Sequence, residues 1–336
     1  MNRILVTRTD RLGDVILATP VLRRLIRSYP GAEIDFLVRK DWLPVLRYPD
    51  PVRTLVFDPD APADALADSL RQRNYDAAFV LRDEKPVTRA VSNARIPVRV
   101  GPLSTFRSFF HFNRGKFQRR SRCLKHEAEY NLDLVGGDSA GGSALPDAWI
   151  ETDSNAKQAA GKFLSDRGLL PGNFVVIHPG SSGSARYVRQ EALQSLASAL
   201  LGKGTPVLVS GGPAEGALIE AFHSKIPGVI LLGSDAGIGL DGLAEVMRQA
   251  RTVVAHGTGP LHLAAAVGTP VLAIFPPLFV LSEKRWGPLV SPRSVWVPGV
   301  SCPEKFRCAG SKCPVYDCMD QFNVDSAMRT LETLHR

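Results

Sequence analysis

Residues 252–275 read TVVAHGTGPLHLAAAVGTPVLAIF, and this stretch decides the fold. The apolar run from Thr252 to Val254 predicts a buried strand, and the segment from Pro260 to Val267 predicts a helix. Val271 to Phe275 predicts the next strand. A strand, a tight turn, a helix and a second strand make up the repeating unit of a parallel sheet with flanking helices.

The same alternation of apolar strands and helical segments runs through both halves of the chain. The expected strands are Ile4 to Val6, Ile34 to Val38, Thr54 to Phe57, Ala77 to Leu81, Val98 to Val100, Phe174 to Ile177, Val207 to Val209, Val229 to Leu232, Thr252 to Val254 and Val271 to Phe275. A helix is expected from Val15 to Ser28. We therefore predict an α/β protein with two Rossmann-like domains.

The predicted domains are residues 1–145 and 146–322. Gly136 to Ser143 holds almost no apolar side chain, which is typical of a surface connection near a domain boundary. The parallel sheets of the two domains are expected to face a central cleft. The last segment, residues 323–336, predicts a helix that packs back on the first domain.

A chain of 336 residues with 44% hydrophobic content can bury two α/β cores. No apolar run approaches the roughly 20 residues that a membrane-spanning helix needs, and Arg8 interrupts the first apolar run too early for a secretory signal. The sequence therefore predicts a cytoplasmic protein. Its formal charge of +8 favours an acidic partner: a phosphate-bearing or acidic sugar, an anionic membrane surface or nucleic acid.

One segment concentrates positive charge among aromatic side chains. Its members are Phe106, Arg107, Phe109, Phe110, Phe112, Arg114, Lys116, Phe117, Arg119, Arg120, Arg122 and Lys125. One interpretation is a solvated basic loop over a few core aromatics, and the other is a site for an acceptor or a membrane surface. Because the chain carries no zinc-finger, helix-turn-helix or RNA-binding signature, nucleic acid is not expected as a partner.

The first candidate site follows the first strand, at the strand end where parallel sheets bind ligands. Gly13 permits a ligand to approach the backbone closely, and Asp14 can act as a base toward that ligand. The alternative is that Asp14 only caps the following helix, a preferred position for Asp.

Further candidate turns follow strands in the second half. His178 to Arg186 offers small and hydroxyl residues whose N–H groups suit an anion, with Arg186 as a planar cation, although a plain flexible loop is the alternative. Glu215 can accept hydrogen bonds from a ribose or base, or only complement a helix dipole.

The third turn, Gly257-Thr258-Gly259, precedes Pro260 and leaves a helix N-terminus open for a diphosphate. His262 lies about one turn further along this helix. Its imidazole can donate to a phosphate, or it can be a packed, hydrogen-bonded core residue.

Together these segments resemble the ADP-heptose glycosyltransferases of glycosyltransferase family 9, the heptosyltransferases that build the inner core of lipopolysaccharide. The matching motifs are Arg11 to Val15 with Thr19-Pro20, His126-Glu127 with Tyr130, His178 to Ser182, Ser210 to Pro213 with Glu215, and Thr258 to Ala266. The resemblance rests on their order and spacing, and it covers most of the chain.

The resemblance implies a GT-B fold and an inverting, metal-independent enzyme that needs no cofactor. It would move a heptose or a similar sugar from an ADP-sugar to a lipopolysaccharide core or related saccharide acceptor. Asp14 would be the general base, and Arg186 stands where the family usually has a lysine that neutralises the leaving group. The implied substrate-binding residues are Gly13, Ser181, Ser182, Glu215, Thr258, Gly259 and His262. An anionic or lipid-linked acceptor implies peripheral contact with the cytoplasmic face of the inner membrane.

Two positions depart from the family pattern. Family members commonly have Asp where this chain has Gly257, and Lys-x-Trp-Pro where it has Arg186 to Arg189. The alternatives are therefore another nucleotide-sugar or a protein acceptor on the same fold, or a nucleotide-binding or assembly protein without turnover. An NAD-dependent oxidoreductase is disfavoured because no good Gly-x-Gly-x-x-Gly follows the first strand.

Four of the five cysteines lie close together near the end of the chain: Cys302, Cys308, Cys313 and Cys318. Their spacing lacks the Cys-x-x-Cys pair of ordinary zinc sites, and cytoplasmic proteins rarely keep stable disulfides. The interpretations are a bound zinc or iron ion, buried thiols, and redox-labile pairs. Some protein-modifying relatives in the resembled family bind iron through a similar cluster.

Overall fold

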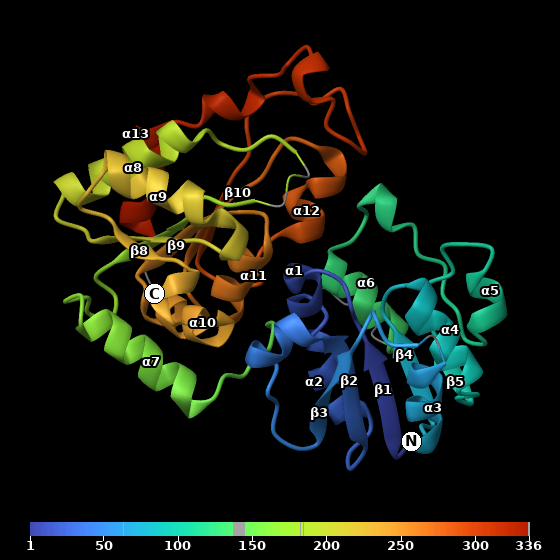
Figure 1. The fold of residues 1–336 in the computed structure, drawn as a ribbon. Helices are drawn as coiled ribbons and strands as arrows, with labels where there is room; N and C mark the ends of the chain where they lie inside the picture. Colours follow the sequence, from blue (N-terminus) through green and yellow to red (C-terminus); the bar gives the residue numbers. More distant parts are fainter. Residues whose placement is uncertain (63, 137–144, 182, 184, 335–336) are drawn as a thin grey trace. The chain divides into compact units, whose positions relative to one another are not determined.

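The computed structural model describes residues 1–62, 64–136, 145–181, 183 and 185–334. Contacts divide the chain into two compact units, Met1–Glu151 and Thr152–Arg336. Each unit contains one parallel sheet with flanking helices, as predicted (Figure 1). The predicted boundary at residues 145/146 lies close to this division, and most of the predicted connection, 137–143, falls outside the described residues. None of the described helices is long and apolar enough to cross a membrane.

The first unit has a five-stranded sheet in the order β3-β2-β1-β4-β5, with every strand pair parallel. Its strands are β1 (Arg3–Thr7), β2 (Glu33–Arg39), β3 (Val52–Phe57), β4 (Ala77–Val80) and β5 (Val98–Val100). Its helices are α1 (Leu12–Ile16), α2 (Pro20–Ser28), α3 (Ala65–Gln72), α4 (Lys85–Asn93), α5 (Ser108–His111) and α6 (Glu127–Leu134), with 3-10 turns η1 (Lys40–Val45) and η2 (Arg120–Arg122). All five predicted strands of this half are confirmed.

The expected single helix from Val15 to Ser28 is wrong. The structure has two helices, α1 and α2, and Pro20 is the first residue of the second. Proline has no backbone N–H to continue the hydrogen-bonding ladder of α1, but its fixed φ suits the first position of a new helix.

The second unit has a six-stranded parallel sheet in the order β11-β10-β9-β6-β7-β8. Its strands are β6 (Val175–His178), β7 (Val207–Ser210), β8 (Ile230–Leu232), β9 (Thr252–His256), β10 (Val271–Ile274) and β11 (Arg293–Trp296). Its helices are α7 (Ser154–Ser165), α8 (Gln190–Gly202), α9 (Gly216–Lys225), α10 (Leu240–Gln249), α11 (Gly259–Ala266), α12 (Glu283–Trp286) and α13 (Val324–Thr333). Its 3-10 turns are η4 (Pro213–Glu215), η5 (Ser234–Ala236), η6 (Phe279–Leu281), η7 (Gly310–Lys312) and η8 (Cys318–Gln321).

The apolar face of the last helix, α13, packs into the second unit and not onto the first domain. Ala327, Met328 and Leu331 of α13 are buried in the core of the second unit, together with apolar residues of α8. The prediction that this helix packs back on the first domain is therefore wrong. Helix α13 packs against α8 and β10, which both belong to the second unit.

Candidate functional site

A buried arginine organises the turn after β1. Arg8 directly follows this strand, and its side chain is 2% exposed. Its guanidinium donates hydrogen bonds to Asp10 Oδ1 at 2.8 Å and to Asp14 Oδ1 at 2.6 Å. Nη1 also donates to Glu127 Oε1 at 3.0 Å and Asn131 Oδ1 at 3.1 Å, both on α6. One cation therefore connects the turn to a helix far along the sequence.

Asp14 lies in the first turn of α1 but does not cap it. The N-cap residue is Arg11, and no described side chain makes a capping hydrogen bond there. Burial raises the pKa of Asp14 from 3.8 to about 6; Arg8 opposes this rise, while the negative charges of Asp10 and Glu127 add to it. The capping interpretation is wrong, and Asp14 is a carboxyl group with a pKa near the working range of a general base.

Acidic and basic side chains alternate in the hydrogen-bonded network around Arg8. Burial alone would lower the pKa of Arg8, but Asp10, Glu127 and Asp14 raise it, so the guanidinium stays charged. Burial likewise opposes ionisation of Asp10, yet Arg8 and Arg82 hold its pKa below the usual range. Neighbouring carboxyl groups thus have pKa values shifted in opposite directions, which is the pattern by which active sites separate an acid from a base.

Sequence reasoning assigned no role to Arg8 or Glu127. Glu127 is fully buried and also accepts from Arg120, whose other nitrogen donates to the backbone oxygen of Leu81 at 2.9 Å. The signals were present: Arg8 is a charged residue at the end of an apolar strand, and Glu127 belongs to the noted His126-Glu127 motif. Only the fold brings these two segments together.

Two pockets lie in the first unit beside this network. One has a volume of about 520 Å³ and is lined by Thr9, Asp10, Arg11, Arg39, Trp42, Arg82, Asp83, Glu84, Lys85 and Arg107. The other has a volume of about 630 Å³ and is lined by Arg82, Asp83, Pro102, Leu103, Ser104, Phe117, Gln118, Arg119, Arg120, Ser121 and Arg122. They share Arg82 and Asp83, and their many guanidinium groups suit an anionic or phosphorylated ligand.

In the second unit, two histidines lie side by side at the carboxyl ends of neighbouring strands. His178 ends β6 and pairs in register with Ala255, the residue before His256 at the end of β9. Burial lowers the pKa of His178, against the opposing charge of Glu215. Burial and then His178 lower the pKa of His256 to about 4, against a backbone contact from Gly180. Sequence reasoning gave neither histidine a role.

Glu215 turns its carboxylate toward the second candidate turn. Its Oε2 accepts a hydrogen bond from the Gly212 N–H at 2.7 Å and lies 3.5 Å from His178 Nε2. A Cβ atom on Gly180 would overlap this carboxylate, so the turn accommodates Glu215 because that position is glycine. Ser181 is partly exposed beside it, and the predicted site residue Ser182 lies outside the described residues.

The third turn leads into α11 through Thr258, its N-cap residue. No described side chain caps this helix, because the Thr258 hydroxyl donates to the His256 backbone oxygen at 3.2 Å. Gly259 is partly exposed at the first helical position, so the helix start is open to an anion. His262 is only 3% exposed, which fits the core interpretation better than an open phosphate contact.

Phe275 explains why position 257 is glycine. A Cβ atom there would overlap the Phe275 ring, lying 2.8 Å from its Cδ1, and Phe275 is 1% exposed. The aromatic ring thus occupies the space that the Asp common at this position in the resembled family would need.

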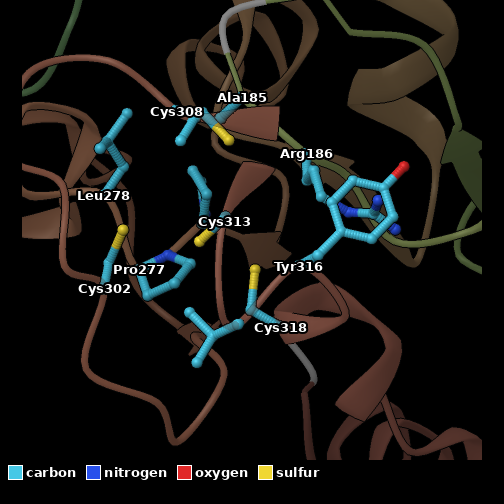
Figure 2. A pocket seen from close by; sticks show the side chains of 12 residues that line it. Ala185, Arg186, Pro277, Leu278, Cys302, Cys308, Cys313, Tyr316 and Cys318 are labelled. Atoms are coloured by element: carbon cyan, nitrogen blue, oxygen red, sulfur yellow. The ribbon is translucent and has the colours of Figure 1, made fainter. Parts of the chain in front are cut away.

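Arg186 is held by the segment that precedes α13. Its guanidinium lies 3.6 Å from the centroid of the Tyr316 ring (Figure 2). Its Nη2 is 3.7 Å from Asp320 Oδ1. Arg189 makes a two-pronged contact with the same Asp320, at 2.8 Å and 2.5 Å. Arg186 is 18% exposed, so it is fixed in position but still accessible.

The four clustered cysteines line a small pocket next to Arg186. It has a volume of about 20 Å³, and Figure 2 shows Cys302, Cys308, Cys313 and Cys318 arranged around it with Tyr316. All four are free thiols. Within the described part of the chain, no three His, Cys, Asp or Glu side chains are arranged to hold a metal ion. The interpretation as buried thiols holds for Cys318 alone, because Cys302, Cys308 and Cys313 are half-buried.

Comparisons with known proteins agree on one group. The family model described as "Glycosyltransferase family 9 (heptosyltransferase)" matches residues 64–308. Lipopolysaccharide heptosyltransferase 3 of Escherichia coli is 24% identical over 288 residues, 78% of this chain and 80% of the relative. Among solved structures, E. coli ADP-heptose LPS heptosyltransferase II superposes with a TM-score of 0.80 at 18% identity, covering 99% and 98% of the two chains. E. coli heptosyltransferase WaaC with ADP-2-deoxy-2-fluoro heptose superposes with a TM-score of 0.70 at 19% identity, covering 98% and 99%.

Proposed function

Since the chain belongs to glycosyltransferase family 9, the heptosyltransferases, and has the GT-B fold of its structural neighbours, we propose that it moves a heptose or similar sugar from an ADP-sugar to a lipopolysaccharide core or related saccharide. Support comes from the relative named as a lipopolysaccharide heptosyltransferase and from the neighbour with a bound ADP-heptose analogue. We place the reaction in the cytoplasm, at the surface of the inner membrane.

In the proposed reaction, an acceptor hydroxyl held by the first unit transfers its proton to the Asp14 carboxylate. The acceptor oxygen bonds to the anomeric carbon while the bond from that carbon to the diphosphate oxygen breaks. ADP leaves with the electron pair, and a single displacement of this kind inverts the anomeric configuration. Arg8 holds Asp14 in place through the 2.6 Å hydrogen bond, and Gly13 allows the acceptor to approach the backbone.

The second unit would hold the ADP-sugar. The open start of α11, with Thr258 and Gly259, supplies N–H groups for the diphosphate, and Arg186 offsets the charge that ADP gains as it leaves. Preorganised N–H groups and one cation can offset the negative charge of the departing ADP without a divalent metal. We assign Ser181 and Ser182 to the same diphosphate region and Glu215 to the adenosine side, while His262, at 3% exposed, would support this region from the core.

The observation that carries the proposal is the half-buried Asp14, whose pKa is raised to about 6 beside the fixed charge of Arg8. The test is ADP release from ADP-heptose in the presence of acceptor. Asp14→Asn should lower kcat by roughly a hundredfold or more while ADP still binds. Asp68→Asn is the matched control, because Asp68 is an exposed carboxylate of the same unit and should leave turnover unchanged. Wild-type turnover by folded Asp14→Asn would exclude Asp14 as the base.

The contact between Phe275 and Gly257 favours a second candidate, the same reaction with another nucleotide-sugar, because the acidic side chain common in the resembled family has no space here. A thermal-shift panel of ADP-, UDP-, GDP- and CDP-sugars separates the two. Stabilisation by ADP-sugars alone supports the first. Stabilisation by UDP-sugars alone would exclude ADP-heptose as donor without affecting the fold assignment.

A further inference from the structure

Four phenylalanines of the first unit lie on its surface instead of in its core. Phe106, Phe109, Phe110 and Phe117, which we call the phenylalanine patch, are 81%, 49%, 70% and 76% exposed. Single exposed apolar residues are common on soluble proteins, but large aromatic side chains gathered in one place usually mark an interaction surface.

The members of the patch contact one another. Phe106 and Phe110 pack edge-to-face with ring centroids 5.2 Å apart, and Phe109 and Phe117 do so at 5.6 Å. Both pairs come from α5 and its flanking loops, which lie next to α4 in Figure 1. The exposed rings therefore form two packed pairs on one short segment.

The segment that carries the patch is anchored to the rest of the first unit. Phe112, between the exposed residues, is 6% exposed and belongs to the core of the first unit. The Arg99 side chain donates to the His111 backbone oxygen at 2.7 Å, and the Lys116 N–H donates to the Gly101 oxygen at 2.9 Å. Because the segment is anchored on both sides of α5, the exposure of its phenylalanines is a property of the fold.

The segment that carries the patch has no acidic residue of its own, and one of its cations, Arg107, pairs with Asp83 at 2.9 Å. Residues 85–126 contain no Asp or Glu. Arg114, Arg119 and Arg122 are exposed on the same segment as the patch. Aromatic side chains bordered by exposed cations are the combination that binds an anionic lipid surface, in which the rings enter the headgroup boundary and the cations face lipid phosphates.

We propose that the phenylalanine patch and its bordering arginines dock the first unit on an anionic phospholipid bilayer. Phe117 also lines the 630 Å³ pocket, together with Arg82, which donates to Asp10 at 2.6 Å within the Asp14 network. Docking therefore places this pocket at the lipid surface. If the proposed function holds, a lipid-linked acceptor can keep its lipid in the bilayer while its saccharide enters the pocket.

The test measures co-sedimentation of the full-length protein with vesicles of phosphatidylglycerol and phosphatidylethanolamine, and with vesicles of phosphatidylcholine. Wild type should bind the anionic vesicles, bind them less at high salt, and leave neutral vesicles largely unbound. The double variant Phe106→Ser/Phe110→Ser should weaken binding about tenfold or more, and Arg114→Gln about fivefold.

Phe306→Ser is the matched control. Phe306 is 67% exposed but lies in the second unit, so its loss should leave vesicle binding unchanged. Docking is refuted if the double variant binds anionic vesicles as wild type does, or if wild type binds neutral vesicles equally well. It is also refuted if light scattering shows a wild-type dimer that the double variant converts to a monomer, because the patch would then join two copies of the chain.

Transfer to a delipidated, water-soluble acceptor separates this proposal from the proposed function. The double variant should match wild type in that assay, since neither phenylalanine belongs to the proposed catalytic or donor-binding residues. A wild-type protein that binds anionic vesicles through the patch but transfers no sugar would disprove the proposed function and leave the docking surface in place.

Discussion

Replacing Asp14 by Asn should stabilise the protein at neutral pH even as it slows transfer. The pKa of Asp14 is raised from 3.8 to about 6 chiefly by burial, so ionisation of this carboxyl costs the folded state free energy. At about 1.4 kcal/mol per pH unit, the cost is about 3 kcal/mol above pH 6. Below pH 3.8 the group is protonated in both the folded and unfolded states, and the cost disappears. Stability therefore falls as pH rises between these two values.

The assay is urea denaturation of wild type and Asp14→Asn at pH 7.5 and pH 4. The variant should gain a free energy of unfolding of about 3 kcal/mol at pH 7.5 and less than about 1 kcal/mol at pH 4. Asn keeps an oxygen that can accept from Arg8, so the packing is nearly conserved. A difference that does not change with pH would refute the argument that burial raises this pKa.

Asp10→Asn supplies a control of opposite sign. Asp10 has a lowered pKa because Arg8 and Arg82 outweigh its burial, so its ionised form stabilises the folded state. This stabilisation is present above the unfolded-state pKa and is lost as pH falls through the lower folded-state value. Asp10→Asn should therefore destabilise the protein at pH 7.5 and have a smaller effect in acid.

Three further outcomes are expected. The kcat/KM for transfer should rise with pH through about 6 with a slope of one on logarithmic axes, because Asp14 must be ionised to accept a proton; a flat profile there would contradict its role as base. Gly257→Ala should lower the free energy of unfolding by about 1–3 kcal/mol because of overlap with Phe275, and Phe275→Leu should restore part of the loss in thermal denaturation. Tyr316→Leu should reduce kcat roughly 2- to 30-fold by releasing Arg186, with little change in far-UV circular dichroism.

The central strands of both sheets were predictable because they are buried on both faces. Such strands are continuous apolar runs, as at Val271–Ile274, and they stand out against the polar turns between them. The edge strand Arg293–Trp296 escaped prediction because it is only partly buried and begins with a charged residue. The break before Pro20 was also readable in principle, since proline inside a helical pattern starts a new helix more readily than it continues an old one.

The candidate site was predictable only in its local parts. Gly13, Asp14 and the third turn follow strand ends, so their positions at the carboxyl edges of the sheets follow from topology. The ionic partners of Asp14 could not be derived this way, because Glu127 is more than a hundred residues away and no local pattern pairs it with Arg8. The same holds for Arg186, whose contact with Tyr316 depends on how the irregular segment before α13 folds back.

The anchoring of Arg186 has a consequence for the order in which the enzyme matures. Both sheets are complete once Trp296 has been synthesised, but Tyr316 and Asp320 come later. A chain that emerges from the ribosome N-terminus first can therefore form both sheets before Tyr316 and Asp320 hold Arg186 in place. Competence for transfer would be acquired in the final stage of translation, when Tyr316 and Asp320 reach Arg186 and α13 completes the core of the second unit.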